Sequence, residues 1–473
     1  MKTRVSGVKF GLILMTAAVS LLSLECRAQD GWSKPFNGKD LTGWFETGGI
    51  NGKHVWKAKD GMIIGTSVPG QANGFLLIDK EYGDFVLELE VSVDTLMNNS
   101  GVQVRSLTYP EYNNWRLHGY QVEIEPLTLH RSGAIYDEGT MRQWLTTASE
   151  LSPAAKNAFK RDNKKGYQWN KYRIEAVGST IRTWVNGIPA AHLVDDKTLR
   201  GYIGFQMHAN NPQDPQGVFS IRFRNLRIQT GDLKLSPLDD GLVVNLIPNN
   251  LSPQEEKNGY VMLWDGRSSK GWKGPNNSEF PKNSWSIANG ELSTLKPEGS
   301  EPEYLVSEKA YGAFELKFDF KFSAGSNSGV KYFVNTGDGS REAALSSLEF
   351  QIVDDASPDL APNRKLGTLA DIQERPAPPS LAGAPNGTVP LRPPKVDQWN
   401  RAMIIARPDN HVEYWLNGFK ILEYERGSSE FKELVSKSKY KDLPNFGMSP
   451  TGHILLENNG TGVSFRSIKI KAY

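Results

Sequence analysis

The sequence contains one cysteine in 473 residues, few signals for long helices, and no basic tract beyond its first residues. A single cysteine cannot form an intrachain disulfide, so the fold must be stabilised by core packing. The basic and acidic residues number 55 and 53, which argues against a nucleic-acid partner. The chain also lacks closely paired histidines and a strand–Gly-x-Ser-x-Gly–helix context, so neither a tight metal motif nor a serine nucleophile is predicted.

Residues 1–28 have the features of a secretion signal: a basic start, the apolar run 10–24, and a small-residue cleavage pattern ending at Ala28. The run is shorter than the ~20 residues that span a bilayer, so we expect no stable transmembrane anchor. Glu25 directly before Cys26 argues against a lipid anchor at that cysteine. We therefore expect a periplasmic or extracellular protein whose mature chain lacks cysteine.

The amino-acid composition favours β-structure. The sequence has 45 Gly, 27 Pro and 12 Trp, and its Val/Ile/Phe/Tyr-rich runs are short and bounded by turn residues. The segments 184–193 and 415–424 each have an Asn-Gly pair between two such runs, which predicts hairpins. Ser152 and Pro153 predict one short helix start, whereas the Pro-rich stretch 375–394 cannot be helical.

The chain contains the same domain twice. Motifs of the first half return at offsets of about 228–230 residues, among them FNGKDLTGW/WDGRSSKGW, YGDFVLELEV/YGAFELKFDF, NSGV/NSGV, WNKYRIEA/WNRAMIIA and WVNG/WLNG. A repeat of this length indicates duplicated domains and not a solenoid. We predict an all-β fold of two tandem antiparallel sandwiches at 29–230 and 259–473, joined by a linker at 231–258.

One strand concentrates acidic groups on a regular scaffold. In GYQVEIEP, the residues Gln121, Glu123 and Glu125 alternate with apolar ones, so they share one face of the strand. Neighbours on that face lie roughly 6.5–7 Å apart, a spacing that suits carboxylates sharing a sugar. The following SGAIYDEG adds Asp137 and Glu138 after a glycine bend.

These motifs resemble the 3-keto-disaccharide hydrolase domain family, through FNGKDLTGW, NSGVQVRS, GYQVEIEP, SGAIYDEG and WNKYRIEAVGSTIRTWVNG. The resemblance covers nearly all of 32–228 and, more weakly, 259–471. It implies concanavalin-like sandwiches and a secreted enzyme that cleaves glycosides carrying a 3-keto group. Such chemistry needs a base near C2, an acid for the leaving oxygen and a donor at the enolate oxygen. Simple hydrolysis instead needs two carboxylates around the anomeric carbon, and Glu123 and Glu125 suit either scheme.

The resemblance also implies a Leu-Gln-Asp-His-Gly strand near the end of each half. The first half has Gln206 and His208 at the Gln and His positions but lacks the Asp, and residues 456–460 of the second half lack the His. By sequence, Glu123 aligns with Val353. We therefore expect the first half to be active and the second to be a degenerate partner.

The predicted site contains two groups of residues. The catalytic candidates are Glu123, Glu125, His208 and Asp137, and the substrate-binding candidates are Arg105, Gln121, Glu138, Arg142, Trp144 and Gln206. A divalent metal is possible, since carboxylates and histidine are suitable ligands. A non-catalytic, lectin-like sugar-binding protein is the alternative, and the sequence leaves the oligomeric state open.

Overall fold

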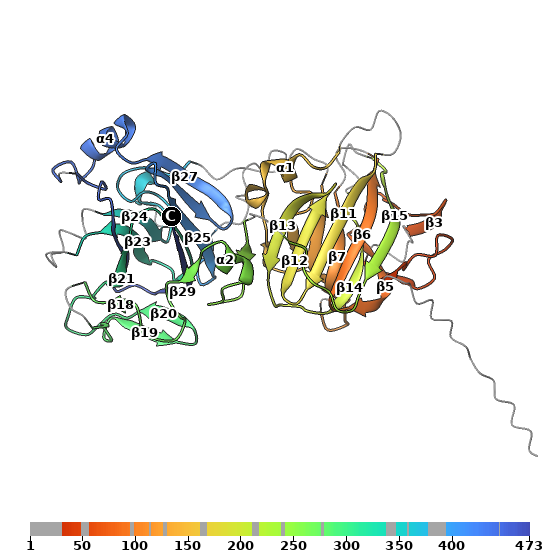
Figure 1. Ribbon diagram of the computed structural model, residues 1–473, viewed down its shortest axis with the longest axis horizontal. Coiled ribbons are helices and arrows are strands. Elements are labelled where there is room, and N and C mark those ends of the chain that lie inside the picture. The colour runs from red at the N-terminus through yellow and green to blue at the C-terminus, as the bar shows by residue number, and fades with distance from the viewer. Residues whose placement is uncertain are drawn as a thin grey trace, which may run out of the picture.

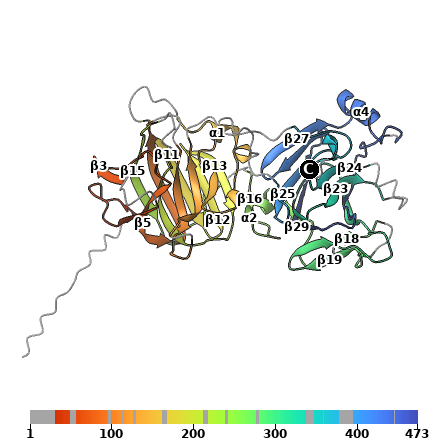
Figure 2. The same ribbon diagram turned by 180° about the vertical axis from the view of Figure 1, so that it is seen from behind.

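The structure is a computed structural model that describes residues 31–48, 56–94, 99–112, 115–125, 130–160, 168–210, 217–237, 242–275, 279–336, 347–356, 359–376, 394–443 and 445–473. Two β-sandwiches lie next to each other along the long axis of the molecule, with helix α2 (Pro253–Lys257) between them (Figures 1 and 2). The predicted fold class is confirmed. The predicted secretion signal and most of the predicted Pro-rich loop lie outside the described residues.

The first sandwich consists of two layers, sheet A and sheet B, that are antiparallel except for one short parallel pair at the edge of sheet A. Sheet A has the order β16-β13-β12-β11-β6-β15-β4-β3, with β1 paired to β15. Its strands are β1 (Trp32–Ser33), β3 (Trp56–Lys59), β4 (Met62–Thr66), β6 (Phe85–Val93), β11 (Asn170–Val177), β12 (Thr180–Val185), β13 (Ile188–Val194), β15 (Ser220–Gln229) and β16 (Val244–Asn245).

Sheet B, the second layer, has the order β10-β9-β8-β7-β14-β5-β2. Its strands are β2 (Trp44–Gly48), β5 (Gly74–Tyr82), β7 (Ser100–Leu107), β8 (His118–Ile124), β9 (Ile135–Glu138), β10 (Gln143–Trp144) and β14 (Gly201–Met207). The short helices η1 (Ala148–Glu150) and α1 (Pro153–Lys156) follow β10. Helix α1 begins after Ser152, as predicted, and the Ser152 hydroxyl accepts a hydrogen bond from Ala155 N.

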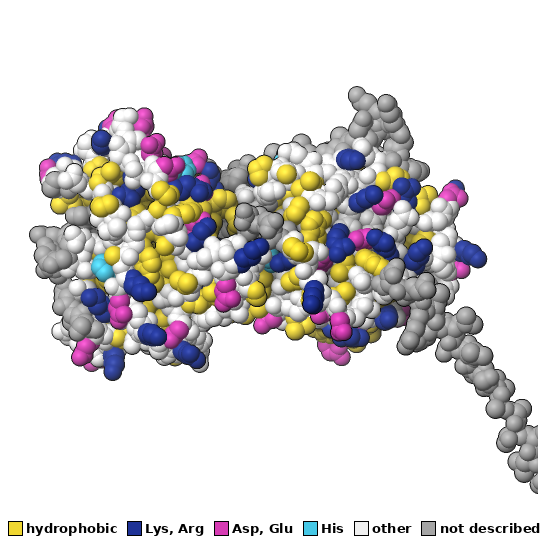
Figure 3. Space-filling view, viewed as in Figure 1, with side chains coloured by type: hydrophobic (Ala, Val, Ile, Leu, Met, Phe, Trp, Pro, Cys, Tyr) yellow, Lys and Arg dark blue, Asp and Glu magenta, His cyan; other side chains and the backbone are white. Residues whose placement is uncertain are grey.

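The alternation of side chains in β6 explains the layering. Leu87, Leu89 and Val91 are buried in the core between the sheets, whereas Glu88 and Glu90 point outward. On the outer face of sheet A these glutamates pair with arginines of β11 and β15, for example Arg173 with Glu88 at 2.5 Å. Figure 3 shows Lys and Arg side chains gathered over these strands. This outer face is therefore a charged surface with its ion pairs already formed.

The second sandwich repeats the plan with sheets C and D. Sheet C contains β17 (Val261–Met262), β19 (Trp285–Ala288), β20 (Glu291–Thr294), β22 (Phe314–Phe322), β25 (Asn400–Ala406), β26 (His411–Leu416), β27 (Phe419–Glu425) and β29 (Val463–Ala472). Sheet D has the order β18 (Trp272–Lys273), β21 (Leu305–Tyr311), β28 (Gly452–Leu456), β23 (Asn327–Val334), β24 (Leu348–Val353). Helices η2 (Pro362–Arg364) and α4 (Ser429–Ser436) lie outside these sheets.

Both predicted Asn-Gly hairpins are present. They join β12 to β13 and β26 to β27, and both residues of each pair have positive φ, for example 50° at Asn186 and 82° at Gly187. That conformation matches the twist of antiparallel strands, and Asn and Gly are the residues that adopt it at least cost. No helix among the described residues is long and apolar enough to cross a membrane.

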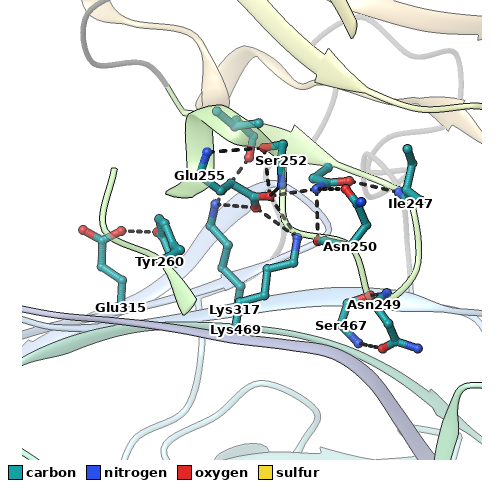
Figure 4. A network of polar contacts seen from close by, with 12 residues as sticks. Ile247, Asn249, Asn250, Ser252, Glu255, Tyr260, Glu315, Lys317, Ser467 and Lys469 are labelled. Atoms are coloured by element: carbon teal, nitrogen blue, oxygen red, sulfur yellow. Dashed lines mark hydrogen bonds and ion pairs between the residues drawn. The ribbon is translucent and has the colours of Figure 1, made fainter. Parts of the chain in front are cut away.

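The linker fastens the two sandwiches together. Its strand β16 pairs in parallel with β13 of sheet A, and its helix α2 places Glu255 over the outer face of sheet C. There the Glu255 carboxylate contacts Lys469 at 3.0 Å and Lys317 at 3.7 Å (Figure 4). Burial raises the pKa of Glu255, but the two ammonium groups outweigh this effect and the net pKa is lowered.

Direct contacts between the sandwiches complete the junction. The Thr147 hydroxyl, at the start of η1, donates to Gly418 O at 2.6 Å, and Arg401 of β25 pairs with Glu150 at 3.2 Å. These contacts join the β10–η1 region of the first sandwich to sheet C of the second.

We predict that Glu255→Gln lowers the free energy of unfolding by about 3 kcal/mol. The substitution leaves Lys317 and Lys469, at the junction of the two sandwiches, without their buried counter-ion. Urea unfolding measures the change. Glu433→Gln is the control, since the exposed pair of Glu433 with Lys437 should contribute no more than about 0.5 kcal/mol. Equal effects of the two substitutions would contradict the prediction.

Candidate active site

The outer face of sheet B carries a row of hydrogen-bonded polar side chains. In β8, Tyr120, Val122 and Ile124 are fully buried in the core, so Gln121 and Glu123 project to the opposite side, as predicted. Gln103 of β7 lies directly across from Gln121 and donates to its side-chain oxygen. Strands β7 and β8 thus build the row from side chains that are almost completely buried although they face away from the core.

Both oxygens of Glu123 are held by amides. Gln121 Nε2 donates to Glu123 Oε1 at 2.6 Å, and Asn99 Nδ2 donates to Glu123 Oε2 at 3.1 Å. Burial, and then the negative charge of Glu125, raises the pKa of Glu123 to about 8 despite these donors. Glu123 is therefore a fixed carboxyl group that exchanges a proton near neutral pH, which is the property required of a general base or acid.

Gly101 makes room for this row. It lies opposite Glu123 in β7, and a Cβ atom at this position would approach the Gln121 side chain to 2.3 Å. A side chain at residue 101 would displace the amide that holds Glu123. The Gly of the repeated NSGV motif is thus required by the close approach of a neighbouring side chain.

A second carboxyl group, Glu138 of β9, lies on the same face. Arg116 Nη2 contacts Glu138 Oε1 at 3.2 Å, and the amides of Asn73 and Gln206 reach Glu138 at 3.5 Å. Burial raises the pKa of Glu138, opposed by the Arg116 charge, by Asn73 and by His208. Gln206 Oε1 is buried, and no described residue supplies it with a hydrogen-bond donor.

His208 lies close to Glu138 and not in the protein core. Its ring is partly exposed, and its Nδ1 lies 3.0 Å from Ala209 O. The predicted group of Gln121, Glu123, Glu138 and Gln206 thus shares one face with His208 beside Glu138. The catalytic and binding roles assigned to these residues stay predictions.

Aromatic and basic side chains form one wall of the site. Arg131 lies 4.5 Å from the centre of the Trp144 ring and 3.7 Å from Glu125 Oε2, and Trp144 packs edge-on against Tyr136 at 5.1 Å. No hydrogen-bond partner for Arg131 Nη2 is found among the described residues. Trp144 and Glu125, both predicted, therefore lie beside the row, and Arg131 was not predicted.

Two predicted residues face elsewhere. Asp137 and Arg142 pair with each other at 2.5 Å, and Arg142 also contacts Asp195 at 2.8 Å, which accepts a hydrogen bond from the core residue Tyr120. Because alternation places Asp137 on the opposite side of β9 from Glu138, this ion-pair cluster does not reach the polar row. Their placement in the site is corrected accordingly.

Arg105 is also remote from the row. The register of β7 and β8 shifts between Val104 and Leu107, and Arg105 has a positive φ of 49° at this bulge. Its guanidinium donates to Gly83 O at 2.9 Å and Gly178 O at 2.6 Å, and pairs with Asp84 at 2.9 Å. Arg105, predicted as a substrate-binding residue, therefore ties together two turns and does not lie on the polar face, because the bulge breaks the alternation.

The second sandwich keeps the scaffold of the site but not its chemistry. Glu123 pairs with Gly101, and Gln351 pairs with the equivalent Gly329, so Gln351 and not Val353 takes the place of Glu123. The alignment expected from sequence was two residues out of register. Asn327, which corresponds to Asn99, accepts a hydrogen bond from Gln351 at 2.9 Å. The amide of Gln351 fills the position but cannot exchange a proton.

Three further residues around Gln351 differ from their counterparts in the first sandwich. Lys331 takes the place of Gln103, Glu349 that of Gln121, and Glu457 that of Gln206. Lys331 Nζ lies 2.6 Å from Glu349 and 3.0 Å from Glu457, all three buried. Burial, and then Glu457, raises the pKa of Glu349. The second face therefore consists of a buried ion cluster.

The described residues contain no group of three or more His, Cys, Asp or Glu side chains arranged to hold a metal ion. In the first sandwich the carboxyl groups instead contact amides and arginines. Residues that motif reasoning overlooked are Asn73, Arg116 and Arg131, which have no repeated pattern in the sequence and come into the site through loops. Asn99 is also absent from the predicted site residues, although its amide donates a hydrogen bond to Glu123.

Fold and site together define a tandem β-sandwich protein with a carboxyl-centred polar face on its first domain. The model of the 3-keto-alpha-glucoside-1,2-lyase-like domain matches residues 31–229 and again 259–471. The chain belongs to this family, in two tandem copies, as its motifs predicted.

Each individual relative matches a part of this chain about as long as one sandwich. A protein of Bacteroides thetaiotaomicron named 3-keto-disaccharide hydrolase is 25% identical over 239 residues, 46% of this chain and 79% of the relative. The structure of a candidate glycosyl hydrolase of Parabacteroides distasonis is 28% identical in sequence, with a TM-score of 0.41. The match covers 48% of this chain and 99% of the hydrolase chain. A second such protein from that organism is 23% identical, with a TM-score of 0.32. The match covers 43% of this chain and 99% of that protein's chain.

We predict that Gly101→Ala destabilises the protein by about 1–3 kcal/mol, because its methyl group would overlap the Gln121 side chain. The control is Gly83→Ala, whose Cβ would meet nothing closer than 3.8 Å. Thermal and urea unfolding of both variants checks the prediction. A Gly101→Ala protein as stable as Gly83→Ala would show that the row is not tightly packed.

A second prediction concerns pH. Because the pKa of Glu123 is raised to about 8 from 4.5, its contribution to stability is complete below pH 4.5 and is lost as pH rises through 8. Relative to Glu123→Gln, the wild type should therefore lose about 5 kcal/mol between pH 4.5 and 8.5. Urea unfolding across this range measures the difference. The curve for Glu433→Gln should run parallel to that of the wild type.

Proposed function

We propose that the first sandwich cleaves the glycosidic bond of 3-keto-glycosides, with Glu123 as the base. The observation that carries the proposal is the amide-held Glu123 carboxyl group, whose pKa lies near 8. Support comes from membership of the family and from the relative named 3-keto-disaccharide hydrolase. Secretion through residues 1–28 is part of the proposal and accords with extracellular sugars as substrates.

The chemistry favours elimination over direct hydrolysis. A ketone at C3 acidifies the hydrogen on C2, so a carboxylate with a pKa near 8 is well matched to remove it. A glycosidase nucleophile, in contrast, must also leave the sugar again, and a carboxylate of raised pKa is a poorer leaving group. We infer from this match that Glu123 acts as the base toward C2.

The remaining steps use other groups on the same face. The C2 proton passes to Glu123, and the electron pair forms an enolate whose oxygen can accept a hydrogen bond from Arg131 Nη2. As the carbonyl re-forms, a C1–C2 double bond forms and the C1–O bond breaks. The leaving oxygen takes a proton from Glu138, whose pKa is raised by burial. The products are an unsaturated keto sugar and the free alcohol.

The test uses purified full-length protein and a 3-keto-disaccharide, with and without a chelator. We expect Glu123→Gln to lower kcat by about 100-fold or more, because it removes the base while keeping shape. For the wild type, kcat/KM should rise with pH up to about 8 as Glu123 ionises. Gln351→Ala in the second sandwich is the control and should keep wild-type rates.

Isotope labelling separates the two mechanisms. Replacement of the C2 hydrogen by deuterium should slow cleavage about two- to sixfold if its removal limits the rate. Cleavage without any isotope effect and with direct formation of the 3-keto sugar would favour hydrolysis. Binding of the disaccharide by both wild type and Glu123→Gln, with no cleavage, would overturn the enzyme proposal in favour of a sugar-binding protein.

A further inference from the structure

One tryptophan differs from all others in its environment. All twelve tryptophans lie in described regions, and eleven of them are buried or half-buried. Trp115 alone is exposed, with 52% of its surface accessible. The exposed part of this large aromatic side chain gains nothing from burial in the folded chain, and its flat apolar face is suited to stacking on a ligand ring.

The backbone of Trp115 is held in place from two sides. Its carbonyl oxygen accepts hydrogen bonds from the Thr108 hydroxyl at 2.8 Å and from the Thr47 hydroxyl of β2 at 3.2 Å. Its φ is +65°, a region that non-glycine residues seldom adopt. A residue kept in a strained conformation by surrounding contacts is a feature of ligand sites. The ring is thus presented from a fixed backbone.

The residues that follow Trp115 connect it to the candidate site. Arg116 pairs with Glu138 at 3.2 Å, and Leu117 packs against Phe75 and Leu77 on the outer face of sheet B. Trp115 therefore stands on a wall that borders the polar face on the Glu138 side. This position distinguishes it from Trp144, which lies beside Arg131 and Glu125.

We infer that Trp115 stacks on the sugar ring of the leaving group, the ring joined through the bond that is cleaved. The inference rests on the proposed function, in which Glu138 protonates the leaving oxygen. Arg116, the residue after Trp115 in the chain, touches that carboxyl group, so Trp115 borders the leaving-group side. Trp115 is then a specificity residue that favours disaccharides over glycosides with a small leaving group.

The experiment compares two substrates in the full-length protein, a 3-keto-disaccharide and methyl 3-keto-glucoside. The measured quantity is the ratio of their kcat/KM values. We expect Trp115→Ala to lower this ratio at least tenfold, and Trp115→Phe, which keeps a flat ring, to restore most of it. Tyr473→Ala removes an aromatic of similar exposure, 50%, from the far end of the chain and should leave the ratio unchanged.

The outcomes separate the two proposals. If the wild type cleaves neither substrate, the proposed function fails. If it cleaves both and Trp115→Ala lowers both rates equally, the stacking inference is overturned while the proposed function stands. Circular dichroism and the urea midpoint of Trp115→Ala show whether the variant is folded. The ratio of the two kcat/KM values does not depend on the fraction of the protein that is folded, because both values scale with it.

Discussion

The hydrogen bonds that connect Gln103, Gln121 and Glu123 are the constraint on which the rest of the first domain depends. They keep a carboxyl group dry on the outside of a sheet, where a charged side chain would otherwise extend into solvent. The amides satisfy its oxygens but carry no charge, so burial decides its proton affinity. A cation at the same place would oppose this rise in pKa, as Lys331 does for Glu349 in the second sandwich.

The two sandwiches show what happens when this row is altered on one scaffold. In the second domain, Lys331 occupies the centre of the equivalent face and binds Glu349 and Glu457. The cation neutralises its neighbours, and Gln351 replaces the proton-exchanging group. The interstrand scaffold is retained while the proton-exchanging carboxyl group is not.

The fold was predictable from the sequence because its signals are local and repeated. Alternation in β8, the Asn-Gly hairpins and the duplicated motifs each follow from short-range chemistry, and they correctly placed Gln121 and Glu123 on one face. The bulge at Arg105 was not predictable, since a single inserted residue reverses every side chain after it. Arg116 and Asn73 enter the site from loops, where no periodicity exists.

The error over Glu123 and Val353 has a physical explanation too. Letter similarity between YQVEIE and FQIVDD pairs the two glutamines, whereas strand pairing is fixed by hydrogen bonds to the neighbouring strand. Sequence comparison does not contain that pairing information.

The parallel pairing of β16 with β13 has a consequence for how the molecule can be divided. Without residues 244–245, β13 would be the outermost strand of sheet A, and its free N–H and C=O groups would be open to pairing with another chain. A first domain truncated at the end of β15 would therefore expose β13 as an unpaired edge strand that can pair with another chain. The segment between the domains acts as a protective border strand for one sandwich while its helix is fastened to the other.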